Sequence, residues 1–125
     1  MAVTESTENY LETILMLLQK QVDVHAIDIC TQLGFSRPTV STAVKQLKSR
    51  GYITVSAENH IQLTESGYEI AAKIYERHRL IAEILMWLGV DEETAYQDSC
   101  RIEHDLSEKS FSCIKERYLK SRDKT

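Results

Sequence analysis

One short segment near the C-terminus carries three side chains that can bind a metal ion. Cys100, Glu103 and His104 follow one another at positions i, i+3 and i+4. On a helix this spacing puts a thiolate, a carboxylate and an imidazole on one face, within reach of a common cation. The same triplet also arises by chance, because a helical cysteine is most often a small buried hydrophobe. The segment therefore predicts a divalent-metal site only if further ligands join it.

Candidate supporting ligands lie on two other predicted helices. His78 falls in the long apolar-periodic stretch before the triplet, and Asn9 and Glu12 lie one turn apart near the N-terminus. The alternative roles are a partly buried helical histidine for His78 and a solvated face residue for Glu12. The chain has no Gly-rich loop and no H-E-x-x-H pattern. We therefore do not expect an enzyme that uses Glu103 as a base beside a metal-bound water.

A second set of polar residues opens the predicted helix 37–50. Ser36 can cap this helix, and Pro38 fits its first turn, where the missing N–H of proline costs nothing. From 36 to 50 the chain has four basic residues and no acidic one, although the whole protein has a formal charge of −4. Small hydroxyl and basic side chains suit close contact with DNA phosphates and base edges. The residues expected to contact DNA are Ser36, Arg37, Pro38, Thr39, Ser41, Thr42 and Lys45.

The order of elements around that helix is typical of a winged helix-turn-helix. Apolar residues at three- and four-residue steps predict helices over 6–21 and 27–33, and the turn that starts at Gly34 has the length the motif requires. Short β-branched runs at 52–55 and 61–64 predict a hairpin wing. Alternative roles for the basic helix are a solvated surface and a protein-interaction module.

The second half of the chain is predicted to be helical. A helix of roughly twenty residues starts after Thr64 and ends near Gly89. Asp91 can cap a fifth helix that extends to about Leu106, and Ser107 can start a sixth. We therefore expect a mainly α protein: a winged head of three helices and a β-hairpin, followed by a helical part.

Composition limits the classes of protein that fit. A chain of 125 residues with 42% apolar residues, four glycines and one proline favours one or two compact domains with long helices. Three widely spaced cysteines without a C-x-x-C pair argue against a disulfide scaffold or a zinc ribbon, and fit a reducing setting. No apolar stretch approaches about eighteen residues, and the N-terminus lacks signal features. These features predict a cytoplasmic protein without a membrane segment.

Five short motifs occur in a defined order along nearly the whole chain. They are Ser36-Arg37-Pro38-Thr39-Val40-Ser41, Leu63-Thr64-x-x-Gly67, Arg77-His78-Arg79-Leu80, Leu88-Gly89-Val90-Asp91 and Cys100-x-x-Glu103-His104-x-Leu106-Ser107. Each motif alone is loose. Their ordered combination resembles the diphtheria toxin repressor family of metal-dependent transcription regulators, particularly its short manganese transport regulator branch.

The resemblance implies a homodimeric repressor that binds a palindromic operator in double-stranded DNA and controls metal-ion homeostasis genes. It divides the chain into a winged helix-turn-helix domain over 1–66 and a helical metal-binding and dimerisation domain over 67–125. It also implies one or two divalent ions per subunit, Mn²⁺ or Fe²⁺, that act as corepressor. Because the chain ends near the sixth helix, without the C-terminal domain of longer relatives, we expect a reduced dimer interface.

Matching positions imply which residues bind the ions. Asn9, Cys100, Glu103 and His104 surround one ion in this correspondence. Glu12 and His78 hold a second, with Glu103 bridging the two.

Several positions depart from the family pattern. Asn9 stands where the manganese branch has Asp and the iron branch has Met. Cys100 is the iron-branch residue, whereas the manganese branch has Glu. Ala82 replaces a carboxylate that often supports the histidine, and Tyr96 replaces an iron-branch histidine. These departures leave open the choice between manganese and iron, and the alternative of a winged-helix regulator whose degenerate metal site responds to another signal.

Overall fold

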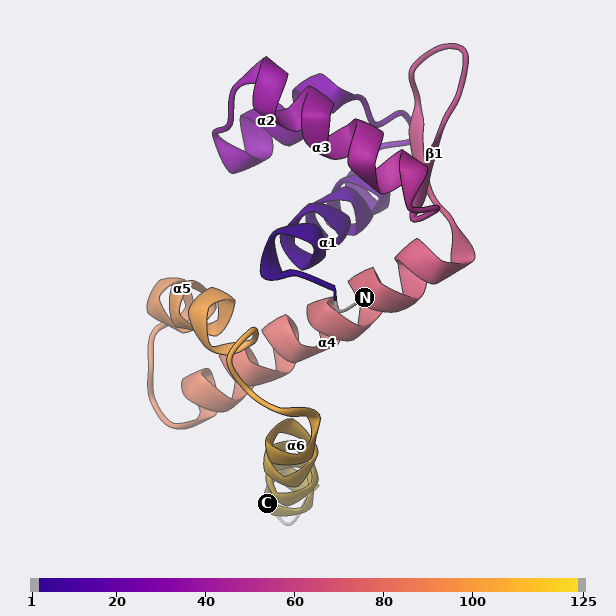
Figure 1. The fold of residues 1–125 in the computed structure, drawn as a ribbon. Coiled ribbons are helices and arrows are strands. Elements are labelled where there is room, and N and C mark those ends of the chain that lie inside the picture. The colour runs from indigo at the N-terminus through magenta and orange to yellow at the C-terminus, as the bar shows by residue number, and fades with distance from the viewer. Residues whose placement is uncertain (1–2, 124–125) are drawn as a thin grey trace. The chain divides into compact units, whose positions relative to one another are not determined.

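The computed structural model describes residues 3–123. Within that range the chain forms six helices and one antiparallel hairpin, as Figure 1 shows, so the predicted mainly α class is confirmed. The chain separates into two compact units, Met1–Lys73 and Ile74–Thr125, and the division falls inside one long helix. Residues 1–2, part of the N-terminus that is predicted to lack signal features, and residues 124–125 lie outside the described residues.

The first unit contains the winged head. Its elements are α1 (Glu5–Lys20), α2 (Ala26–Leu33), α3 (Arg37–Ser49), β1 (Ile53–Val55), β2 (Ile61–Leu63) and the first turns of α4 (Glu65–Trp87). The second unit contains the rest of α4 and two further helices, α5 (Glu92–Ile102) and α6 (Glu108–Asp123).

Local sequence signals account for the helix boundaries in the first unit. The side chain of Thr4 accepts a hydrogen bond from the Thr7 N–H and caps α1. Ser36 caps α3 in the same way, and proline follows in the first turn. Gly34 ends α2 with a left-handed backbone, φ 71°, which glycine adopts without a steric penalty. These signals fix the tight turn between α2 and α3.

The hairpin is joined to the helices by its buried face. Ile53 pairs with Leu63 and Val55 with Ile61, so one face of the ribbon carries the isoleucines, which are only 2% and 1% exposed. The helix α1 packs against α2 and β2, while α3 packs against α2 and β1. The hairpin therefore shares one core with the three helices.

The second unit has its own apolar cluster. Leu80 and Ile81 of α4 pack with Phe111 and Tyr118 of α6. The Trp87 ring meets the Tyr118 ring edge-on, with centroids 5.4 Å apart. This packing holds α6 against the second half of α4.

The predicted length of the fifth helix is wrong. The helix α5 ends at Ile102, and the residues up to Leu106 form turns. The guanidinium of Arg77 donates hydrogen bonds to the carbonyl oxygens of Glu103 and Leu106, at 3.2 Å and 2.8 Å. These carbonyls therefore accept hydrogen bonds from the buried Arg77 side chain and not from backbone N–H groups of a continued helix. The helix α5 therefore ends within the triplet of Cys100, Glu103 and His104 that is predicted to bind a metal.

Nothing in the described range 3–123 combines the length and the apolar character that a bilayer-crossing helix needs.

Candidate metal centre and nucleic-acid interface

The residues predicted to contact DNA gather on the first turns of α3. All seven are exposed, whereas Val40 and Leu47 on the opposite side of the helix are buried. The Thr42 hydroxyl donates to the Pro38 carbonyl at 3.0 Å, which holds that side chain against the helix. The structure thus leaves a polar and basic surface at the start of α3. Its residues are Ser36, Arg37, Pro38, Thr39, Ser41, Thr42 and Lys45.

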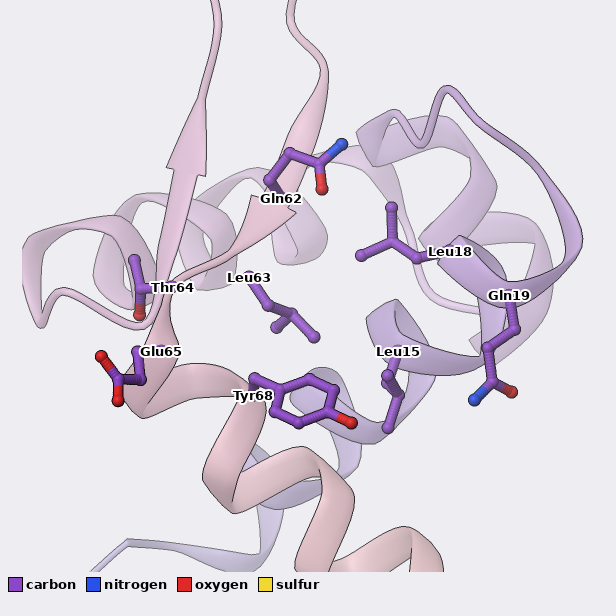
Figure 2. A pocket seen from close by; sticks show the side chains of 8 residues that line it. All are labelled: Leu15, Leu18, Gln19, Gln62, Leu63, Thr64, Glu65 and Tyr68. Atoms are coloured by element: carbon purple, nitrogen blue, oxygen red, sulfur yellow. The ribbon is translucent and has the colours of Figure 1, made fainter.

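Two pockets of the first unit are lined by none of these seven residues. Figure 2 shows the larger, about 480 Å³, where Tyr68 of α4 faces Leu15 of α1 and Leu63 of β2. None of the predicted metal or DNA residues lines it. The other, about 300 Å³, is lined by Asn9 together with Tyr10 and Phe35, whose rings lie 6.1 Å apart.

The centre of the predicted metal site in the second unit is a contact between α4 and the end of α5. His78 Nδ1 lies 2.8 Å from Glu103 Oε2. Both residues are buried, at 7% and 1% exposure. A buried carboxylate beside an imidazole is the donor pair that binds divalent transition metals. The structure therefore brings together two predicted ligands that lie 25 positions apart in the chain.

Glu103 also approaches the second histidine of the site. Its other oxygen, Oε1, lies 3.3 Å from His104 Nε2, and the His104 side chain is 3% exposed. Oε1 is buried and accepts no hydrogen bond among the described residues. Glu103 thus stands between two imidazoles, one on each carboxylate oxygen.

Three further side chains lie close to the His78 ring. Cys100 Sγ lies 3.6 Å from Nδ1, and Ser99 Oγ lies 3.4 Å from the same nitrogen. The Ser99 hydroxyl also donates to the backbone carbonyl of His78 and is fully buried. The Tyr96 ring, at the position of the iron-branch histidine, lies 5.4 Å from the His78 ring. Cys100 is exposed, so one side of this group is open to solvent.

Electrostatics favour a cation at this place. Hydrogen bonds with Cys100 and Glu103 raise the pKa of His78 to about 10, well above its ordinary value of 6.5. A proton thus occupies a position surrounded by sulfur and carboxylate donors. A divalent ion offers these donors more charge than a proton does, and imidazole, carboxylate and thiolate together suit Fe²⁺, Co²⁺, Ni²⁺ and Zn²⁺. The residues present therefore fit a bound metal ion.

The two predicted ligands of α1 belong to the first unit. Asn9 is partly buried, and Glu12 is buried at 7% exposure. They lie one turn apart on the helix, as their spacing predicts.

Arg77 is a site residue that the sequence did not single out as functional. It is buried at 8% exposure beside His78, and its guanidinium lies 5.0 Å from the centre of the Phe111 ring. Through its bond to the Glu103 carbonyl it fixes the backbone that carries Glu103 and His104. Arg77 belongs to the motif Arg77-His78-Arg79-Leu80, but its position next to a histidine in the sequence does not show that the arginine side chain is buried.

Replacing Arg77 with methionine is expected to lower the free energy of unfolding by about 3 kcal/mol, because two charge-assisted hydrogen bonds are lost, one of them to the buried carbonyl of Glu103. Urea unfolding followed by circular dichroism measures this loss. The matched control is Arg79→Met, since Arg79 is exposed and its guanidinium lies 5.7 Å from the Tyr75 ring. The control is expected to cost less than about 1 kcal/mol. Equal losses in the two variants would contradict the role given to Arg77.

Comparison with known proteins agrees with both halves of this description. Residues 2–61 match the iron dependent repressor N-terminal DNA binding domain. Residues 64–122 match the iron dependent repressor metal binding and dimerisation domain.

Individual relatives show the same relationship. The transcriptional regulator MntR of Escherichia coli is 31% identical over 111 residues, which cover 89% of this chain and 72% of that protein. An uncharacterised HTH-type transcriptional regulator of Methanocaldococcus jannaschii is 32% identical, covering 98% of this chain and 99% of that protein. The solved structure of the manganese regulator SloR superimposes with a TM-score of 0.76 at 26% identity, covering 96% of this chain and 55% of that one.

The chain thus spans about half the length of the SloR structure, and nearly all of the archaeal relative. The two domain matches together extend from residue 2 to residue 122, so the likeness includes the winged head and the helices that carry His78 and Glu103. The resemblance seen in the sequence motifs is confirmed: the chain belongs to the iron-dependent repressor family of metal-dependent transcriptional regulators, which are DNA-binding proteins and not enzymes.

Proposed function

We propose that this protein is a homodimeric, cytoplasmic repressor that binds a palindromic operator when Mn²⁺ or Fe²⁺ occupies the site around His78 and Glu103. The observation that carries the proposal is the buried contact of Glu103 with two imidazoles, beside Cys100, in a chain whose head has the fold of a DNA-binding domain. One or two ions per subunit, and control of metal-ion homeostasis genes, belong to the same proposal.

The start of α3 is the surface proposed to enter the major groove. Its N-terminal turn allows DNA to approach closely, because the hydroxyl residues there are small and exposed, while the buried residues of the helix face the core. Arg37 and Lys45 supply positive charge without a nearby acidic residue in the helix. Phosphate contacts from such residues give affinity, while base-edge contacts give sequence preference.

Replacing Lys45 with alanine is expected to weaken DNA binding similarly for all DNA sequences and to reduce the slope of log Kd against log salt by about one, because one phosphate contact is lost. Fluorescence anisotropy over a range of KCl concentrations measures the slope. Lys109→Ala is the control, since Lys109 is an exposed residue of α6 outside the DNA-binding domain. A change in sequence preference without a change in slope would instead show a base contact.

The proposed ligands are His78, Cys100, Glu103 and His104, with Asn9 and Glu12. The contacts described above support the first four. The assignment of Asn9 and Glu12 as ligands is supported by their matching positions in the family. When bound, the ion supplies positive charge to a group of carboxylate, thiolate and imidazole donors. In this proposal a bound ion favours the DNA-binding state of the protein, with a coupling on the order of 1–3 kcal/mol.

Metal binding at pH 7.5 is expected to release the proton of His78. In the metal-free protein the raised pKa of His78, about 10, means that the imidazole is protonated at that pH. The contribution of protonated His78 to the stability of the folded protein is complete below about pH 6.5 and is lost as pH rises toward 10. A ligand must be deprotonated, so metal affinity should rise over the same pH window.

Calorimetric titration in buffers of different ionisation enthalpy counts the protons released. The variant His78→Gln is expected to release about one proton fewer than wild type. Identical proton release in the two proteins would remove His78 from the ligand set.

The proposed dimer uses the helical unit. Trp87, Leu88 and Ile114 are 51%, 67% and 38% exposed there, and a groove of about 490 Å³ runs between the end of α4 and α6. Apolar residues gathered on one face are typical of a protein–protein interface. A two-fold dimer would present two α3 helices to two half-sites of a palindrome.

The test of the proposed function is a selection of DNA duplexes from a random library, performed with and without Mn²⁺, and with Fe²⁺ under anaerobic conditions. Enrichment of a palindrome only in the presence of metal is the expected result. Anisotropy with the selected duplex and a panel of divalent ions then gives the metal preference. Enrichment that is equal with and without every metal would support a DNA-binding regulator that responds to another signal.

A further inference from the structure

Three ligand-type side chains gather where the hairpin loop meets the connection between α1 and α2, apart from the residues discussed above. His60 Nδ1 lies 3.4 Å from Asp23 Oδ1. The His25 and His60 rings meet edge-on with centroids 4.7 Å apart and an interplanar angle of 79°. All three residues belong to the first unit, and none of them is among the proposed metal ligands or the proposed DNA-contacting residues.

The backbone holds these residues in place. The Ile61 N–H donates to the Val24 carbonyl at 2.8 Å, and both residues are buried, so the positions next to His60 and next to His25 are tied together. The His60 N–H donates to Ser56 Oγ at 3.0 Å, which fixes the loop side. The Asp28 carboxylate accepts the His25 N–H at 2.8 Å. The side chains therefore project from a rigid frame.

The chemistry of the group suits a transition-metal ion. Two ligands at 2.0–2.1 Å from a tetrahedral ion are about 3.4 Å apart, which is the separation of His60 Nδ1 and Asp23 Oδ1. Two imidazoles and a carboxylate, with the Asp28 carboxylate nearby, offer borderline donors and negative charge. The His60 side chain is 33% exposed, so an ion can reach it from solvent.

One side chain must reorient before the three residues can share an ion. The ligand atoms of Asp23, His25 and His60 do not all lie within 4.8 Å of one another in the described chain. Rotation of the partly exposed His25 ring about χ2 reorients its nitrogens, and this torsion is soft in histidine.

We infer that Asp23, His25 and His60 form a second metal site, which takes a Zn²⁺-class ion and clamps the hairpin wing to the segment before α2. A bound ion would link the two segments through their side chains in addition to the Val24–Ile61 hydrogen bond. The position of the wing would then depend on a metal that is bound independently of His78 and Glu103.

Equilibrium dialysis of the metal-free full chain against Zn²⁺ tests the inference. His60→Gln and His25→Gln are each expected to weaken one class of bound Zn²⁺ by at least about 10-fold, and Glu58→Gln, which removes a charge from the same loop, is expected to bind as wild type. Amide exchange gives a local readout. Zn²⁺ should slow exchange of the Ile61 N–H in wild type and in Glu103→Gln, but not in His60→Gln.

Unchanged Zn²⁺ binding in His60→Gln, or equal slowing of Ile61 exchange in that variant, overturns the inference. If His25→Gln fails to fold, Asp23→Asn replaces it, because Asp23 is an exposed residue and its substitution removes only a ligand. Since Glu103→Gln removes the site around His78 and leaves the wing intact, failure of one site is distinguished from failure of the other.

Discussion

Replacing Glu103 with glutamine is expected to abolish metal-dependent DNA binding while the protein remains folded. The Glu103 side chain is 1% exposed and places Oε2 2.8 Å from His78 and Oε1 3.3 Å from His104. Glutamine keeps the volume but exchanges an anionic oxygen for an NH₂ group, which cannot bind a cation. We expect metal affinity to fall by about 100-fold or more, with DNA binding reduced to its metal-free level.

Two measurements on the same preparation check this result: Mn²⁺ binding by equilibrium dialysis, and anisotropy with a selected duplex. The matched control is Glu93→Gln on the exposed first turn of α5, which removes the same charge without touching the site. Circular dichroism of both variants establishes that the helices persist. Metal-responsive DNA binding of Glu103→Gln at the wild-type level would remove Glu103 from the proposed site.

Local signals in the sequence were sufficient for the winged head. Ser36 and Gly34 act within four residues of their own positions, one through a side-chain cap and the other through its left-handed backbone. Two short β-branched runs predicted a hairpin, and the structure pairs Ile53 with Leu63. Each of these features depends on neighbours in the chain, so a single sequence contains the information.

The proposed metal ligands could be predicted by type but not by arrangement. The spacing of Cys100, Glu103 and His104 assumed one continuous helix, whereas α5 ends at Ile102. The contact of Glu103 with His78 nevertheless forms, because Glu103 keeps helical backbone angles as the C-cap. Its Oε1, turned toward His104 beyond the helix, depends on the turn and not on the 3.6-residue period.

Contacts between distant segments explain what the sequence did not show. Arg77 is buried because carbonyl oxygens 26 and 29 positions away accept its hydrogen bonds. The His25 and His60 rings meet because the hairpin loop lies against the segment before α2. Neither pairing leaves a periodic or local pattern, since each depends on how complete elements pack. Such residues are found only when the fold is known.

Replacing Gly67 with alanine is expected to destabilise the winged head strongly, against the ordinary preference of helices for alanine. In a helix interior alanine is favoured over glycine by about 0.5–1 kcal/mol. At Gly67, however, an added Cβ would lie 2.0 Å from the Tyr52 carbonyl oxygen and 2.9 Å from its carbonyl carbon. That carbonyl is not free to move, because it accepts the Thr64 N–H at 3.0 Å.

The clash outweighs the helix preference, so we expect a net loss of about 3 kcal/mol in the free energy of unfolding. Urea unfolding of the full chain measures it, with Glu69→Ala, an exposed position of the same helix, expected to change stability by less than about 0.5 kcal/mol. Tyr52 lies in the connection between α3 and β1, so displacement of its carbonyl group should also disturb the hairpin and weaken DNA binding. Stability at or above wild type in Gly67→Ala would mean that this connection moves at no cost, and that the close approach of α4 does not fix the wing.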